Sequence, residues 1–161
     1  MEFKVGEKAC YPARGVGVIQ AIETFDFEGT RQTVYVLKIL DNGATIRVPI
    51  QNASALGMRP VIHPEQVDKI YALLKDRDVP ADNQTWNRRY REYQNKIQTG
   101  DLIEVAKVLR DLALLRKEKN LSFGERKMFD QARSLLVQEV AVALDEDEKV
   151  IEKKIDELFH A

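Results

Sequence analysis

The sequence predicts an α+β protein in which a small antiparallel β-barrel is followed by an all-helical bundle. Two observations carry this prediction. Up to about residue 60, short runs of β-branched and aromatic residues lie between turns that contain Gly, Pro or Asn. From residue 63 onward, apolar residues recur every three or four positions, as on one face of an amphipathic helix. A chain of 161 residues can hold two small domains of this kind.

The strands are placed by composition and by the turns between them. Pro12 and Gly15 mark a turn after the first short strand. Asn42 with Gly43 predicts a tight hairpin, because Asn-Gly tolerates positive φ values. Pro49 cannot donate to a sheet ladder, so the last strand is expected at a sheet edge or at a strand end. The longer runs with strand character are residues 17–27, 34–40 and 44–50.

The helices are placed by their apolar period and by their expected first residues. A helix opening at His63 and Pro64 is followed by a polar stretch, residues 76–84, which is the best candidate for a domain boundary. A second helix contains Trp86 and stops before Gly100. Pairs with the spacing of a capping box predict three more helix starts: Asp101 with Glu104, Ser122 with Glu125, and Asp145 with Glu148. The expected domains are a barrel (1–60), a helix and linker (61–80) and a helical domain (81–161).

The net charge of −1 hides a segregation of charge along the chain. Residues 86–133 carry twelve Lys and Arg against seven Asp and Glu, whereas residues 134–161 carry three against eight. Such a division predicts a basic surface contributed by one segment of the helical domain. Residues 1–85 are slightly acidic, with ten bases against eleven acids, which disfavours an RNA-binding barrel.

The sequence holds no set of residues typical of an enzyme. It has no glycine-rich phosphate loop, no H-E-x-x-H motif and no supported Ser–His–Asp grouping. Glu125 and Asp130 are interpreted as a solvated acid pair on a helix, and Cys10 as a small apolar strand residue. One cysteine and two distant histidines predict no disulfide, metal or cofactor. Without a signal peptide or an apolar run long enough to span a bilayer, a cytoplasmic protein is expected.

The most informative stretch is residues 85–93, which contains the only Trp, two Tyr and three Arg. In a helix, one face of this stretch and the following turn carries Trp86, Tyr90, Tyr93 and Ile97. Arg88 and Arg91 lie three apart on another face, with Arg89 between the two. An aromatic beside clustered guanidinium groups suits a surface that follows phosphates and stacks on or wedges a base step. The alternative is that Trp86 anchors the core and the arginines form a solvated face.

Four motifs in this order resemble the CarD/CdnL family of bacterial transcription regulators: FKVGEKACYPARGVGVIQAIE, VLKILDNGATIRVP, TWNRRYREY and LSFGERKMFDQARSLLVQEVAVAL. The similarity extends over nearly the whole chain. It implies an N-terminal Tudor/SH3-like barrel that binds the RNA polymerase β subunit. It also implies a helical domain that contacts promoter DNA at the upstream edge of the transcription bubble and so stabilises the open complex.

The resemblance assigns roles to two sets of residues. The strand with Ile46, Arg47, Val48 and Pro49 matches the polymerase-contacting edge of the family, and an edge strand with free backbone groups can add to another sheet. The alternative for Arg47 is an ordinary exposed strand residue. The residues that match DNA-contacting positions are Trp86, as an exposed minor-groove wedge, with Arg88, Arg89, Arg91, Arg126 and Lys127. A solvated helix face is the alternative for Arg126 and Lys127.

The expected partners are therefore the RNA polymerase β subunit and promoter DNA, with no membrane. DNA binding is expected to be weak and largely not sequence-specific, because the chain lacks a long basic extension and gains affinity by tethering to polymerase. A monomer associated with the nucleoid through polymerase is the expected state. The competing interpretation is an adaptor that binds polymerase and recruits another protein, with the acidic residues 145–157 as its contact surface.

Overall fold

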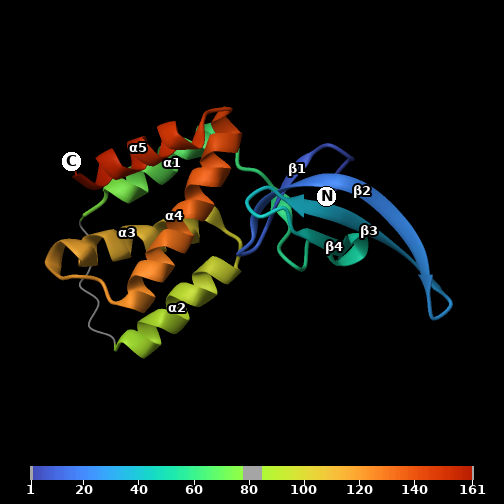
Figure 1. Ribbon diagram of the computed structural model, residues 1–161, viewed down its shortest axis with the longest axis horizontal. Coiled ribbons are helices and arrows are strands. Elements are labelled where there is room, and N and C mark those ends of the chain that lie inside the picture. The colour runs from blue at the N-terminus through green and yellow to red at the C-terminus, as the bar shows by residue number, and fades with distance from the viewer. Residues whose placement is uncertain (1, 78–84, 161) are drawn as a thin grey trace. The chain divides into compact units, whose positions relative to one another are not determined.

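The computed structural model describes residues 2–77 and 85–160, apart from the side chains of Phe27 and Trp86. The chain divides into two compact units, Met1–Val61 and Ile62–Ala161. The first, here called the sheet unit, is built from strands, and the second, the helical unit, from helices (Figure 1). The predicted α+β class is confirmed.

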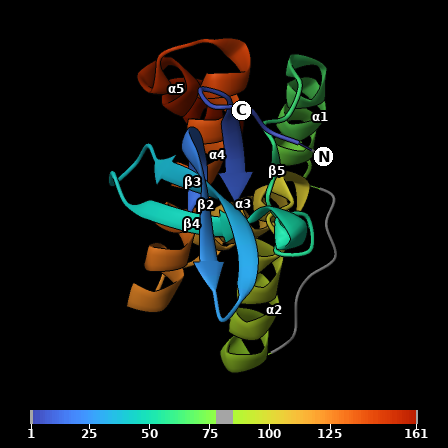
Figure 2. The ribbon, with the colours of Figure 1, turned by 90° about the vertical axis from the view of Figure 1, so that its right-hand side faces the viewer.

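The sheet unit is one five-stranded antiparallel sheet with the order β4-β3-β2-β1-β5. The order can be followed in Figure 2, where β4 and β5 lie on opposite sides of the sheet. Strands β2 and β3 form a long hairpin, and β4 pairs only with the part of β3 between Val34 and Lys38. The elements are β1 (Lys8–Tyr11), β2 (Gly15–Phe27), β3 (Thr30–Ile39), β4 (Thr45–Pro49), the 3₁₀ turn η1 (Ile50–Asn52) and β5 (Arg59–Pro60).

The core of the sheet unit is centred on Tyr35. Its ring is 1% exposed and meets the ring of Phe3 edge-on at 5.7 Å between centroids. Its hydroxyl accepts a hydrogen bond from the Phe3 N–H at 3.0 Å, so the polar end of the ring is satisfied inside the core. Gly17 makes this packing possible, because a Cβ there would lie 2.7 Å from the side chain of Leu37. The sheet unit therefore presents β4 on a rigid base.

The helical unit contains five helices: α1 (Pro64–Lys75), α2 (Trp86–Gln98), α3 (Leu102–Glu118), α4 (Phe123–Leu144) and α5 (Glu148–His160). Helix α3 packs against α1, α2 and α4, and α5 packs against α1 and α4. Helix α1, which the sequence places in a connecting segment, belongs to this unit because Val67, Ile70 and Leu74 are buried. Of the predicted boundary stretch, residues 78–84 lie outside the described residues.

All three predicted helix starts are present, but the residue that caps α5 is Asp147 and not the predicted Asp145. The Ser122 hydroxyl accepts from the Glu125 N–H at 3.2 Å while the Glu125 carboxylate accepts from the Ser122 N–H at 2.8 Å, a complete capping box. Asp145 does not cap α5. It ends α4 in the left-handed conformation, with φ 54°, and Asp147 accepts from the Lys149 N–H instead. Sequence spacing alone could not distinguish two acids two residues apart.

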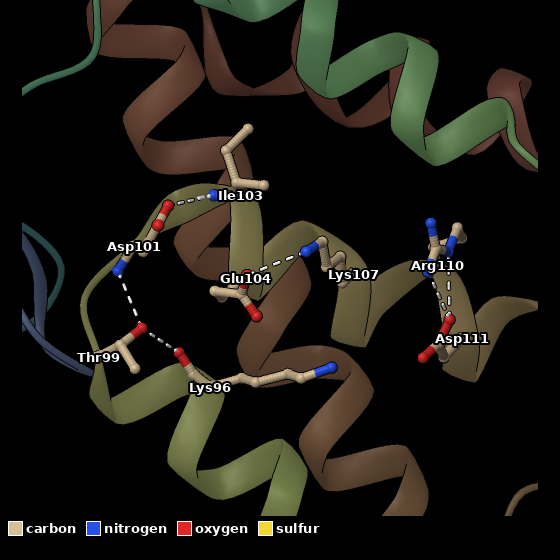
Figure 3. A network of polar contacts seen from close by, with 8 residues as sticks. All are labelled: Lys96, Thr99, Asp101, Ile103, Glu104, Lys107, Arg110 and Asp111. Atoms are coloured by element: carbon tan, nitrogen blue, oxygen red, sulfur yellow. Dashed lines mark hydrogen bonds and ion pairs between the residues drawn. The ribbon is translucent and has the colours of Figure 1, made fainter. Parts of the chain in front are cut away.

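The turn between α2 and α3 is held by a short chain of hydrogen bonds (Figure 3). Asp101 caps α3 by accepting from the Ile103 N–H at 2.9 Å, and its own N–H donates to the Thr99 hydroxyl at 3.2 Å. The predicted capping box is incomplete, because Glu104 pairs with Lys107 at 3.0 Å. This turn fixes where α2 leaves the bundle.

Asp101→Ala is expected to lower the free energy of unfolding of the helical unit by about 1 kcal/mol, because it leaves the first-turn amide of Ile103 without its side-chain acceptor. Urea unfolding followed by far-UV circular dichroism measures the change. Asp101→Asn is the matched control and is expected to lose only a few tenths of a kcal/mol, since Asn caps about as well as Asp. Equal losses in the two variants would contradict a capping role.

Candidate functional site

The first candidate surface is the outer edge of β4. Among the described residues no strand pairs with β4 on the side away from β3. The Ala44 carbonyl accepts from the Ile39 N–H at 2.8 Å, and bonded and non-bonded pairs alternate along an antiparallel ladder. The backbone groups of Ile46 and Val48 therefore face β3, while those of Thr45 and Arg47 face outward. This edge offers hydrogen-bonding groups to an incoming strand.

The four predicted residues of β4 do not share one environment. Val48 is 1% exposed and Ile46 packs half-buried against the same core, so these two side chains anchor the strand. Arg47 lies on the opposite face, with its side chain 59% exposed and its Nε 3.8 Å from the Glu23 carboxylate. Pro49 is half-buried at the end of the strand. Arg47 and the outward backbone groups are thus the parts of this edge that a partner can reach.

The second candidate surface is the first half of α2. Arg88 and Arg91 are exposed on one side of the helix, as the spacing predicts. Tyr93 and Ile97 are buried, with 4% and 0% exposed, and attach the helix to the bundle. Tyr90, which the helical period places on the same face as Tyr93 and Ile97, is not buried with them. It is 40% exposed, and its hydroxyl accepts a hydrogen bond from the Gln94 side chain at 3.1 Å.

Trp86 is the first residue of α2, directly after Thr85, whose side chain makes no capping bond. Its side chain lies outside the described residues, so the predicted exposure of the indole stays a prediction. The backbone position is informative by itself. The buried side chains of α2 among the described residues are Tyr93 and Ile97, in the second half of the helix. Trp86 begins the helix and so lies at the opposite end from these two anchors.

Arg89 differs from its neighbours, because its side chain is only 13% exposed and points to Glu125 of α4. The Arg89 Nη1 lies 3.9 Å from one carboxylate oxygen, and the Lys119 Nζ lies 3.5 Å from the other. The Glu125 side chain is 3% exposed, so the sequence-based interpretation of a solvated acid pair is wrong for Glu125, although Asp130 is exposed. Glu125 joins the start of α4 to α2 and to the end of α3.

The charge on Glu125 is stabilised in this position. Burial by itself would raise the pKa of the carboxyl group. The hydrogen bonds from the Ser122 backbone and hydroxyl, together with the positive charge of Lys119, outweigh burial and hold the pKa below its ordinary value. Glu125 is therefore ionised at neutral pH, and two cations and a helix N-terminus surround it. The sequence signal for the capping role of Glu125 was its spacing of three residues from Ser122. Leu121, the residue before the cap, is buried.

Arg126 and Lys127 lie in the first turn and a half of α4 and are exposed. Glu125 directly precedes Arg126 and Lys127, and its partner Arg89 lies between Arg88 and Arg91 in the sequence. Both pairs of exposed cations are therefore next to the buried Arg89–Glu125 ion pair. Figure 1 shows the first turns of α2 and α4 near each other. The two pairs of cations, which the sequence could not connect, thus belong to neighbouring parts of one unit.

The basic excess of residues 86–133 separates into internal and external charges. Several cations are used inside the helical unit: Arg89 and Lys119 at Glu125, Lys107 at Glu104, Arg110 at Asp111, Arg133 at Asp156, and Arg116 over the ring of Phe129. On the described parts of α2 and α4, the exposed cations that take part in no ion pair are Arg88, Arg91, Arg126 and Lys127, and Lys117 is a further such cation at the end of α3. The four on α2 and α4 are open to an anionic partner and adjoin the Arg89–Glu125 contact.

The described residues form neither a metal-binding cluster nor a helix suited to crossing a membrane. In the described ranges 2–77 and 85–160, no cluster of three or more His, Cys, Asp and Glu side chains has the arrangement of a metal site. None of the described helices combines the length and apolar character that crossing a bilayer requires.

Comparison with known proteins identifies both units. The model of the CarD-like/TRCF RID domain matches residues 3–62, and the model of the CarD C-terminal domain matches residues 69–156. YdeB of Bacillus subtilis (strain 168), which has a provisional designation as a transcription factor, is 33% identical over 153 residues, covering 92% of this chain and 97% of YdeB. A solved structure, CdnLNt from Myxococcus xanthus, is 45% identical over 38% of this chain and 87% of its own, with a TM-score of 0.33. The chain belongs to the CarD-like family of transcription factors, whose N-terminal module is an RNA polymerase-interaction domain.

Proposed function

We propose that the protein binds the RNA polymerase β subunit through β4 and stabilises the open promoter complex by contacting DNA at the upstream edge of the bubble. The observation that carries the DNA part is the set of four exposed, unpaired cations around the Arg89–Glu125 contact. Cations that are not used inside the fold and lie on neighbouring helix turns suit a line of backbone phosphates.

The tether part rests on the β4 edge. Adding a strand to an open edge gains affinity from backbone hydrogen bonds and specificity from the side chains beside it. Thr45 and Arg47 supply outward backbone groups, and the exposed guanidinium of Arg47 supplies a charge beside them. Once the sheet unit is attached to polymerase, the helical unit acts at a high effective concentration, so weak DNA contacts suffice.

Each DNA-contacting residue receives a definite role in this proposal. Arg88, Arg91, Arg126 and Lys127 hold phosphates, and Trp86 wedges or stacks at the unpaired step of the bubble edge. Arg89 is assigned a structural role, because its side chain is directed toward Glu125 and is largely covered. It supports the first turns of α2, which carry Trp86, Arg88 and Arg91.

Arg88→Ala and Arg91→Ala are each expected to lower the salt dependence of DNA binding by about 0.9 in the log–log slope, because each removes one phosphate contact. The affinity of the full-length protein for a duplex promoter fragment, measured by fluorescence anisotropy over a range of salt concentrations, gives the slope. Arg31→Ala is the control, since Arg31 is an exposed arginine of the sheet unit. An unchanged slope in Arg88→Ala and Arg91→Ala would remove both arginines from the DNA surface.

The experiment that tests the whole proposal is site-specific crosslinking in the polymerase–promoter complex. A photo-crosslinking residue placed at position 91 or 126 is expected to label DNA near the upstream edge of the bubble. A probe at position 150, which is exposed on the acidic α5, is expected to label none. If positions 91 and 126 label only protein, the adaptor interpretation replaces this one.

A further inference from the structure

Phe123 is the most exposed large apolar side chain among the described residues, at 74%. It is the first residue of α4, immediately after the Ser122 cap. Single exposed apolar residues are common on protein surfaces. A phenylalanine is nevertheless a poor choice for a first helical position that serves folding alone, because it adds neither a cap nor a charge that favours the helix N-terminus.

Neither the cap nor the core of the helical unit uses this ring. The capping box is complete with Ser122 and Glu125, and the apolar residue before the cap, Leu121, is buried at 9% exposure. Met128 and Phe129, on later turns of α4, supply the first large core contacts of this helix, with 2% and 6% exposed. The Phe123 ring is thus left for a function outside the fold.

The surroundings of the ring are cationic. Arg126 and Lys127 are three and four residues further along α4, so they lie on the same side of the helix as Phe123, and both are exposed. Lys119, 54% exposed at the end of α3, lies 3.5 Å from the carboxylate of Glu125, two residues after Phe123. The nearest acid, Glu125, is buried and paired, whereas the exposed acids of this region, Glu118 and Asp130, are fewer than the cations. A flat apolar ring can stack on a nucleic-acid base, and cations on the next helical turn can bind the phosphates beside that base.

We propose that Phe123 stacks on an unpaired base of promoter DNA whose flanking phosphates are bound by Arg126 and Lys127. This inference rests on the proposed function and gives the helical unit a second aromatic DNA contact, at the start of α4. The starts of α2 and α4 share one order of residues in the sequence: a hydroxyl residue, then an aromatic, then a basic pair within four residues. In α2 these are Thr85, Trp86, Arg88 and Arg89, of which Arg89 is turned to Glu125 and only Arg88 is exposed, and in α4 they are Ser122, Phe123, Arg126 and Lys127, both cations being exposed.

The chemistry is tested by binding of the full-length protein to a short single-stranded DNA oligonucleotide of mixed sequence at low salt. Phe123→Ala and Phe123→Leu are expected to weaken binding about five- to tenfold, because Leu keeps an apolar side chain but offers no ring to stack. Phe123→Trp is expected to retain or strengthen binding. Val150→Ala is the matched control, since Val150 is 53% exposed on α5. Equal affinity in all four variants would overturn the proposal.

A second measurement separates DNA from protein as the partner of the ring. Phe123→Ala is expected to bind polymerase in the absence of DNA as the wild type does, and to prolong open-complex lifetime less. If it loses polymerase binding while its affinity for the oligonucleotide is unchanged, Phe123 contacts protein and the proposal is wrong. If the wild type does not prolong the lifetime but Phe123→Ala still loses oligonucleotide affinity, the proposed function fails and the stacking contact stands.

Discussion

Glu125→Ala is expected to lower the free energy of unfolding of the helical unit by about 3–5 kcal/mol. The carboxylate is 3% exposed, completes the capping box of α4, and neutralises Arg89, which is itself 13% exposed. Removing it therefore takes the Glu125 carboxylate away from a largely covered guanidinium and leaves the Ser122 N–H without its acceptor. Urea unfolding followed by far-UV circular dichroism gives the size of the loss.

Glu125→Gln separates the charge from the cap. A glutamine at this position of a capping box can still accept from the Ser122 N–H, so the expected loss is smaller, about 2 kcal/mol. Arg89→Met combined with Glu125→Gln is expected to recover part of it, because no covered charge then lacks a partner. Arg88→Ala, one residue away on the exposed side, serves as the control and should stay within about 0.5 kcal/mol of the wild type. If the loss of unfolding free energy in the double variant equals the sum of the losses in the two single variants, a direct Arg89–Glu125 interaction is contradicted.

The effect of Glu125 depends on pH in a direction fixed by its lowered pKa. Because the pKa in the folded state lies below the ordinary value of 4.5, the ionised carboxylate stabilises the fold fully above about pH 4.5. That stabilisation is lost as the pH falls through the folded-state pKa. The difference in stability between the wild type and Glu125→Gln should therefore be constant near neutral pH and shrink under acid conditions. A difference that grows on acidification would mean that the pKa is raised.

The same substitutions bear on DNA contact through geometry. In the first two turns of α2, Arg89 is the most covered of the described side chains, whereas the deeper anchors Tyr93 and Ile97 lie further along the helix. Loosening the Arg89–Glu125 contact should widen the range of positions open to Arg88 and Arg91. Glu125→Gln is thus expected to weaken duplex binding although Glu125 is covered and cannot reach a phosphate.

Sequence patterns were sufficient to predict the fold class, because apolar residues alternate in the N-terminal half and recur every three or four positions in the C-terminal half. Alternation and the Asn42–Gly43 turn placed the strands, and capping signals placed the helices. The patterns failed where two residues compete for one role. Asp147 rather than Asp145 caps α5, and Glu104 binds Lys107 rather than completing a capping box. Such choices depend on where the preceding helix ends, which local sequence does not determine.

The candidate site could be predicted as a list of residues but not as an arrangement. Exposure of Arg88 and Arg91 follows from helical spacing, since the opposite side carries the buried Tyr93 and Ile97. The different environment of Arg89 could not be foreseen, because its partner Glu125 lies 36 residues away on another helix. Phe123 was missed for a related reason. Its exposure is visible only when the core of α4 is seen to be filled by other residues.

Trp86→Ala is expected to shorten the lifetime of the open complex by about five- to 150-fold relative to the wild-type protein. A base–aromatic stack contributes about 1–3 kcal/mol, and about 1.36 kcal/mol corresponds to a factor of ten in rate. The loss should appear in the rate of bubble collapse, because the wedge acts only where a base step is already open. A promoter with an unstable bubble gives the largest signal, and competitor challenge of preformed complexes measures the lifetime.

The controls decide whether a wedge or a general contact is responsible. Trp86→Phe keeps an aromatic ring and should retain much of the effect. Phe25→Ala removes an exposed aromatic of the sheet unit and should leave the lifetime unchanged. Both variants, like Trp86→Ala, should still bind the β subunit, because none alters the edge of β4. If Trp86→Ala prolongs the lifetime as the wild type does, the indole is structural, and stabilisation of the bubble must come from the phosphate contacts and the tether.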